Sequence, residues 1–403
     1  MNVHVVLVGH IDHGKSTLIG RLLYDSESIQ DERVAEIQKL AEEYKRRFEF
    51  AYFLDSFEDE LKEERTIDTV SLMFKSTKNF YTITDVPGHK EFIKNMLTGA
   101  SHADVAVLVV AADEGVREQT RRHLFLLKML GITQVFVVVN KMDKLQYNED
   151  QFAVVRNAVS ELLTAFDFKN DVFIPISAME GDNIYQKSAA MGWYNGPTLI
   201  ETLDGVQIRR AERPFRFVVQ DTYTVDSEKL LVGRVESGSV RQGDEVFFAP
   251  AGIRSTVKRI RILGKELDTA YTGDSIGLLL ENDGTVARGN VAGLMTSPPV
   301  PTEKFVGEAV LLDRNLRQGE TLELRCGTAK VRCRIEEIRE KIDSQTGEVI
   351  ASNPEEIQEH DAATILFQTE PVVVERFVTF PELGRFVLVK EGRNIGAGVV
   401  LST

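Results

Sequence analysis

Apolar residues in the first half of the chain form short continuous runs, and polar, amphipathic stretches separate them. The Val- and Ile-rich runs lie at 3–9, 80–85, 105–112, 135–140 and 172–177. Because continuous apolar runs are typical of strands buried on both faces, this pattern predicts an α/β domain built on a parallel sheet. A helix is expected between Ile29 and Phe50, where apolar residues recur at helical spacing among charged ones.

The pattern changes after residues 204–214. Short strand-like segments separated by Gly and Asp turns follow, which is typical of a small β-barrel. The proline-dense stretch at 296–301 marks a second boundary, and the remaining residues again have β character. We therefore expect an α/β domain at 1–208 and two small β-barrel domains at 209–299 and 300–403.

Composition places the chain among ordinary globular proteins. Its 403 residues are 43% hydrophobic and 27% charged, and the formal net charge is −14. This acidic balance argues against broad, non-specific nucleic-acid binding, although a local basic patch would still permit an RNA partner. No apolar run approaches the ~18 residues of a membrane span, and no signal peptide is visible. Two cysteines suffice for neither a disulfide framework nor a metal site, so we expect a cytoplasmic protein without membrane association.

The stretch GHIDHGKST, residues 9–17, matches the phosphate-binding pattern G-x-x-x-x-G-K-[ST]. It follows a predicted strand and opens a predicted helix, whose N-terminus favours a bound anion. Lys15 is predicted to reach the β- and γ-phosphates, and Ser16 is predicted to bind Mg²⁺. The other expected nucleotide contacts in the loop are Gly9, His10, Asp12, His13, Gly14 and Thr17.

A second motif, DVPGH, begins where the next strand ends. Asp85 is placed to hold Mg²⁺ through water, and the N–H of Gly88 is placed to sense a γ-phosphate. Histidines in and after these two motifs suggest a metal site. Mg²⁺ bound to phosphates prefers oxygen ligands, however, so we favour the nucleotide interpretation.

A third motif, NKMD at residues 140–143, follows another strand. The Asp143 carboxylate can accept two N–H bonds from guanine, which adenine does not offer, while Asn140 and Lys141 brace the base. Ser177 and Ala178 end a fifth strand and are placed to support the guanine through a main-chain N–H. The order of these motifs, each after a strand, predicts a P-loop GTPase that uses GTP/GDP and Mg²⁺.

These segments resemble the translational-GTPase superfamily over nearly the whole chain. The similarity includes TIDT, DVPGHKEFIKNMLTGA and GDNIYQKSAAMGWYNGPTL, and in the first barrel GRVESG and GDEVFFAP. Two branches compete. One contains elongation factor Tu and its relatives, which carry aminoacyl-tRNA. The other contains the large, CysN-like GTPase subunit of sulfate adenylyltransferase.

Two features favour the sulfate branch. The segment QTRRH carries Arg122 where the tRNA carriers typically have Glu, and residues 316–338 resemble that branch and lack the carriers' GY-x-P element. This resemblance implies that GTP hydrolysis is coupled to formation of adenosine 5′-phosphosulfate from ATP and sulfate on a small catalytic partner subunit of the ATP-pyrophosphatase type. The alternatives are an elongation factor Tu-like carrier of aminoacyl-tRNA and an unassigned GTPase switch.

The resemblance also implies catalytic roles. Lys15 would neutralise charge on the γ-phosphate, Thr66 would join Ser16 and Asp85 at Mg²⁺, and His89 would position the attacking water. The chain departs from the family where Glu64-Arg65 stand before Thr66 in place of Gly-Ile. Arg65 is therefore a candidate arginine finger, the alternative being an exposed or Glu63-paired side chain.

Overall fold

The computed structural model divides the chain into two compact units. One comprises Met1–Ile208 with Ser344–Gly347, and the other comprises Arg209–Asp343 with Glu348–Thr403. The residues that the structure describes are 2–29, 32, 34, 35, 39, 50, 53, 71–85, 103–169, 172–208, 212–225, 228–262 and 265–403.

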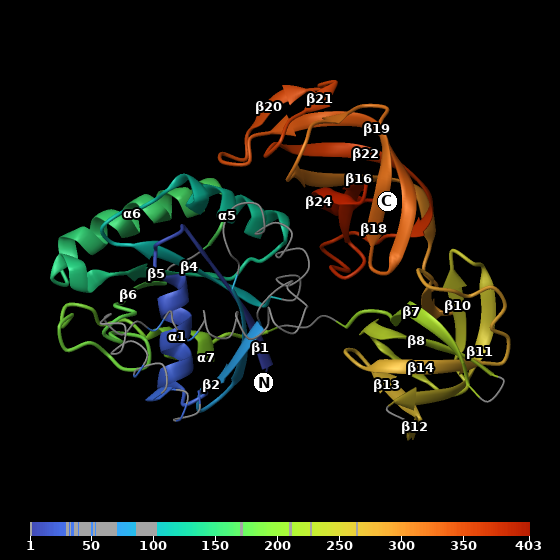
Figure 1. Ribbon diagram of the computed structural model, residues 1–403, viewed down its shortest axis with the longest axis horizontal. Coiled ribbons are helices and arrows are strands. Elements are labelled where there is room, and N and C mark those ends of the chain that lie inside the picture. Colours follow the sequence, from blue (N-terminus) through green and yellow to red (C-terminus); the bar gives the residue numbers. More distant parts are fainter. Residues whose placement is uncertain are drawn as a thin grey trace. The chain divides into compact units, whose positions relative to one another are not determined.

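The first unit contains a six-stranded sheet in the order β2-β3-β1-β4-β5-β6 (Figure 1). All neighbouring strands are parallel except β2 and β3, which are antiparallel. The strands are β1 (Asn2–Gly9), β2 (Ser71–Lys75), β3 (Phe80–Asp85), β4 (Val105–Ala111), β5 (Val135–Asn140) and β6 (Phe173–Pro175). Every residue of β4 is buried, as its unbroken apolar run predicts.

Two helices of this unit begin with a side-chain cap. In α6 (Glu149–Ala165) the side chain of Asn148 caps the first turn, and α7 (Leu199–Asp204) begins with a reciprocal Thr198–Glu201 capping box. The other helical segments are α1 (Lys15–Asp25), α5 (Glu118–Met129) and the 3₁₀ turn η2 (Met142–Leu145). The helix expected between Ile29 and Phe50 falls mostly outside the described residues.

None of the helices in the described part of the chain combines the length and the apolar character needed to cross a membrane.

The second unit contains two antiparallel barrels. The first closes as the ring β10-β15-β7-β8-β14-β11, because β11 also pairs with β10. Closure leaves no open edge in the ring. Its strands are β7 (Arg216–Val225), β8 (Glu228–Ser237), β10 (Glu245–Ala249), β11 (Ile253–Ile262), β14 (Ser275–Leu280) and β15 (Val291–Leu294), with short β9 (Ser239–Arg241), β12 (Lys265–Leu267) and β13 (Thr269–Tyr271) at its border.

The second barrel closes in the same way, as β18-β23-β24-β16-β22-β19 with an added β18–β19 pairing. Its core contains three phenylalanine rings in contact, Phe305, Phe367 and Phe386, with centroids 5.0–5.5 Å apart. The ring strands are β16 (Pro301–Leu311), β18 (Thr321–Cys326), β19 (Ala329–Ile342), β22 (Ala362–Val373), β23 (Arg385–Lys390) and β24 (Arg393–Ser402), and the border strands are β17 (Leu316–Arg317), β20 (Val349–Ser352) and β21 (Glu356–Ile357). The α/β domain followed by two β-barrels is thus the fold predicted from the sequence.

Both cysteines lie in the core of this second barrel. Burial raises the pKa of the Cys326 and Cys333 thiols to about 12, so both are protonated at neutral pH.

Within the second unit, a buried arginine of the first barrel binds residues that follow it in the chain. Arg216 donates through Nε and Nη2 to one oxygen of Glu375, at 3.1 and 3.0 Å, and through Nη1 to the carbonyl of Ser297 at 2.8 Å. Glu375 follows β22 of the second barrel. The guanidinium also lies 5.2 Å from the ring centroid of Phe380. This cluster joins the two barrels through the buried Arg216 guanidinium, whose charge is paired with the Glu375 carboxylate.

We expect Arg216→Ala to lower the free energy of unfolding by about 2–4 kcal/mol, because it leaves a carboxylate and a carbonyl without their buried partner. Urea unfolding followed by circular dichroism measures this loss. The matched control is Arg317→Ala. Arg317 forms an ion pair of similar length, 2.8 Å to Glu356, but the Arg317 side chain is 73% exposed. The control is expected to leave stability close to wild type, and equal losses in the two variants would contradict the prediction.

Candidate nucleotide-binding site

The loop between β1 and α1 lies between two glycines that cannot be replaced without a clash. A Cβ on Gly9 would lie 2.3 Å from the carbonyl oxygen of Val109, and a Cβ on Gly14 would lie 2.4 Å from Nδ2 of Asn140. Gly14 also has a φ of +89°, in the left-handed region, and forms the N-cap of α1. The loop therefore packs directly on β4 and on the end of β5, with the amides of the first turn of α1 at its mouth.

Lys15 folds back over this loop. Its Nζ donates to the carbonyls of Gly9 at 2.8 Å and His10 at 2.9 Å. Ser16 and Thr17 follow in the first turn of α1 and are half-buried, while Asp12 is exposed and left-handed, with φ of 65°. A cation, helix amides and a hydroxyl thus converge on one short loop, which is the donor set that phosphate oxygens require.

Asn140 joins three segments through one buried amide. Its Oδ1 accepts from the backbone N–H of Ala178 at 2.9 Å, and its Nδ2 donates to the carbonyl of His13 at 2.9 Å. The side chain is only 2% exposed, so both halves of the amide are used inside the protein. The phosphate loop, the end of β5 and the 177–178 segment are consequently fixed to one another.

The turn after β5 places a carboxylate beside this junction. Oδ1 of Asp143 accepts from the hydroxyl of Ser177 at 2.6 Å, and Ser177 is itself buried. Three residues of the turn, Lys141, Gln146 and Tyr147, have left-handed φ values between 53° and 64°. Residues 140–147, which carry the predicted guanine contacts, form what we call the guanine turn.

Trp193, the only tryptophan of the chain, braces the guanine turn. Its indole Nε1 donates to the carbonyl of Tyr147 at 3.0 Å, and its ring lies 5.4 Å from that of Phe152. Burial, and then the hydrogen bond to Asp182, raise the pKa of Tyr147 to about 12. The sequence interpretation used the segment around Trp193 only as a family resemblance and did not identify this contact.

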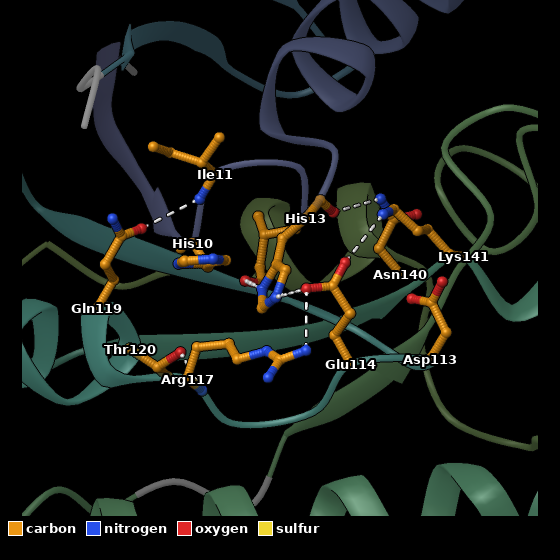
Figure 2. A network of polar contacts seen from close by, with 12 residues as sticks. His10, Ile11, His13, Asp113, Glu114, Arg117, Gln119, Thr120, Asn140 and Lys141 are labelled. Carbon is orange, nitrogen blue, oxygen red and sulfur yellow. Dashed lines mark hydrogen bonds and ion pairs between the residues drawn. The ribbon is translucent and has the colours of Figure 1, made fainter.

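His13 is buried beneath the loop. Its Nδ1 lies 3.2 Å from the carbonyl of Val109, and its ring centroid lies 5.2 Å from that of His10. Burial lowers the pKa of His13 to about 4, despite the opposing effect of the Val109 hydrogen bond. The imidazole is therefore neutral at physiological pH. Its contact with the Val109 carbonyl holds the loop against β4 (Figure 2).

The sequence interpretation missed a polar network that starts from the segment between β4 and α5. The Oε1 of Gln119 accepts from the N–H of Ile11 at 3.1 Å. The Glu114 carboxylate lies 3.7 Å from Nε2 of His13, 3.5 Å from Nη2 of Arg117 and 3.6 Å from Nζ of Lys141 (Figure 2). The only sequence signal was a charged and amide-rich stretch after a buried strand.

The structure places the backbone of Asp85 but says nothing of its side chain. In β3, Asp85 pairs with Leu7 of β1, two residues before Gly9, so the strand ends beside the phosphate loop. Four other predicted positions, Arg65, Thr66, Gly88 and His89, lie outside the described residues. Across the ranges that the structure describes, no group of three or more His, Cys, Asp or Glu side chains is arranged to hold a metal ion.

Three family models match successive parts of the chain. The elongation factor Tu GTP-binding domain matches residues 1–209, elongation factor Tu domain 2 matches 229–292, and the GTP-eEF1A C-terminal domain-like family matches 304–401. Elongation factor 1-alpha of Archaeoglobus fulgidus is 41% identical over 99% of this chain and 97% of its own length. The Pyrococcus furiosus protein of the same name is 40% identical over 100% and 97%. A crystal structure of sup35 with GDP covers 99% of this chain and 93% of its own, at 26% identity and a TM-score of 0.47.

These relatives contradict the sulfate-activation interpretation. Full-length matches to elongation factor 1-alpha leave the sulfate adenylyltransferase activity and its small partner subunit without support, so that prediction of function, enzyme class and partner was wrong. The third domain, which was thought to favour the sulfate branch, matches the eEF1A C-terminal family.

The other signal, Arg122, has a local explanation. Its Nη2 pairs with Oε1 of Glu118 at 2.7 Å, one turn earlier on α5. Such a pair adjusts the charge of a helix surface and carries no chemistry of its own. The family models and the full-length relatives together show that the chain belongs to the elongation factor Tu and elongation factor 1-alpha family of GTP-binding proteins.

Proposed function

We propose that the chain is a translation elongation GTPase that carries aminoacyl-tRNA in its GTP-bound form. The observation that supports the GTP-binding part of this proposal most directly is the Asn140 amide, which holds the phosphate loop and the guanine turn in one rigid arrangement. The names of the full-length relatives favour translation as the process that the GTPase serves.

The phosphate end of the proposed site is formed by the loop at 9–17. Backbone N–H groups of Gly9, His10, Asp12, His13, Gly14, Ser16 and Thr17 would face the phosphates. Lys15 would exchange its carbonyl partners for phosphate oxygens. The lack of room for a Cβ at Gly9 and Gly14 supports this role, since only a bare backbone allows so close an approach.

Oxygen donors near the loop suit Mg²⁺. We propose Ser16 at the start of α1, Asp85 at the end of β3, and Thr66 as its ligands. When bound, the ion would neutralise charge on the β- and γ-phosphates. The half-buried Ser16 and the β3 backbone beside the loop are the observations that support this placement.

The protein's own part in hydrolysis is positioning and charge stabilisation. Lys15 would stabilise the developing negative charge of the γ-phosphate, and His89 would orient the attacking water. Because little covalent chemistry falls to the protein, small shifts of these groups change the rate strongly.

At the base end, the Asp143 carboxylate would accept N1–H and N2–H of guanine. The hydrogen bond that the buried Ser177 hydroxyl donates holds the Asp143 carboxylate in place. The N–H of the next residue, Ala178, donates to the Asn140 amide. Adenine offers no matching pair of donors on that edge, so the preference for guanine follows from this one group.

Aminoacyl-tRNA is the partner that we propose in place of the sulfate-activating subunit. A net charge of −14 disfavours general RNA binding, so we propose that recognition is local. We propose the bounds 1–208, 209–299 and 300–403 for the GTPase domain and the two barrels that would take part.

We expect Asp143→Asn to weaken GDP binding by about 100-fold or more and to improve binding of xanthosine diphosphate. The amide donates where guanine also donates, whereas xanthine presents a carbonyl at that position. Fluorescent-nucleotide titration measures both affinities. Asp150→Asn, at the exposed start of α6, is the control and should bind GDP normally. Unchanged GDP affinity in Asp143→Asn would remove this carboxylate from the site.

We expect the chain to protect the ester bond of aminoacyl-tRNA from hydrolysis with a non-hydrolysable GTP analogue and to protect it far less with GDP. The half-life of the ester at neutral pH is the measurement, and deacylated tRNA serves as the competitor control. Tight binding of the GTP analogue without any protection would overturn the tRNA-carrier function while leaving the GTP site intact.

A further inference from the structure

We propose that Glu114 is a positioning residue for nucleotide retention, because its carboxylate holds Lys141 of the guanine turn and ties that turn to the phosphate loop and to the start of α5. The inference rests on the proposed function, since it requires a guanine nucleotide in this site. Glu114 is not itself among the predicted nucleotide contacts, so it would act through Lys141.

The two oxygens of the carboxylate divide between different segments. Oε1 lies 3.6 Å from Nζ of Lys141, and Oε2 lies 3.7 Å from Nε2 of His13 and 3.5 Å from Nη2 of Arg117. Figure 2 shows the carboxylate between the phosphate loop and the guanine turn. One side chain from outside every nucleotide-binding motif therefore contacts two of those motifs.

The charges at this junction make the carboxylate necessary. His13 is neutral at physiological pH, so Lys141 and Arg117 are the cations that face Glu114. The side chains of Glu114 and Lys141 are 26% and 18% exposed, which screens their attraction less than at an open surface. Without the carboxylate, Lys141 and Arg117 would both lose the anion that they share.

The backbone holds Glu114 in a fixed place. The N–H groups of Glu114 and Gly115 both donate to the carbonyl of Ala111, at 3.3 and 2.9 Å, and Gly115 supplies the left-handed φ of 66° that closes this turn. The N–H of Ala112 donates to the carbonyl of Asn140 at 2.8 Å. The turn that carries Glu114 is thus anchored to the residue that precedes Lys141.

Lys141 depends on such an anchor. It starts η2 with a left-handed φ of 64°, a conformation that a non-glycine residue keeps only when its surroundings impose it. Arg117, the N-cap of α5, is half exposed and contacts the same carboxylate. A displacement of the first turn of α5 would therefore loosen the guanine turn and the phosphate loop together, and would speed nucleotide release.

The test is the dissociation rate of a fluorescent GDP analogue from the full chain in the presence of Mg²⁺. We expect Glu114→Gln, which keeps the shape and removes the charge, to release the nucleotide about three to ten times faster. Asp150→Asn is the control, because it removes an acid at the exposed start of α6, outside the guanine turn. The control should dissociate at the wild-type rate.

A double-mutant cycle separates positioning from general destabilisation. In a Lys141→Met background, adding Glu114→Gln should change the rate less than about twofold, since the partner through which Glu114 acts is gone. Equal acceleration in both backgrounds, or an unchanged rate in Glu114→Gln alone, overturns the inference. If Glu114→Gln does not fold, Glu114→Asp, which withdraws the charge by one methylene, is measured in its place. A wild-type chain that binds no GDP would refute the proposed function, and a result for Glu114 obtained on a GDP-binding chain cannot be confused with that outcome.

Discussion

The arrangement of the site depends on the buried amide of Asn140. A buried amide that loses a partner costs about 1–3 kcal/mol, so its bonds to His13 and Ala178 are retained together. This constraint decides what its neighbours can be. Gly14 must lack a Cβ because Nδ2 of Asn140 occupies the space, and the 177–178 segment must present an N–H at the place where Oδ1 ends. The phosphate loop and the guanine turn are thereby held together by one buried side chain.

Charged side chains near the phosphate loop also help to hold the site together. The chain is acidic as a whole, yet the junction beneath the phosphate loop collects Lys141 and Arg117 around one carboxylate. Burial keeps His13 neutral, so the imidazole supports the loop without adding a third positive charge there. The balance between these groups, more than the net charge, sets how firmly the loop and the guanine turn are held. A state-dependent partner can act on such a balance through small displacements.

The sequence predicted those parts whose signal is local. The buried strands β1, β4 and β5 followed from continuous apolar runs, and the nucleotide motifs followed from their order after strands. The strand β2 was missed because its apolar run is only three residues long and it lies at the sheet edge. The strand pairing within the barrels was not predictable either, since β7 pairs with β15 about seventy residues later. Glu114, Gln119 and Trp193 were missed because each acts on a segment distant in sequence, and no periodicity reports that.

The wrong choice between the two family branches also arose because the sequence does not report which residues are in contact. Arg122 differs from the residue expected in a tRNA carrier, but its partner is Glu118 on the same helix. A substitution that exchanges one surface pair for another costs little, so it drifts freely and discriminates poorly between functions. Gln119, three residues earlier, bonds to the backbone of Ile11 in the phosphate loop. Its replacement would leave an N–H of that loop without its partner, so a change there would alter the site itself. What a residue contacts, and not only whether it matches a motif, therefore determines how much its identity says about function.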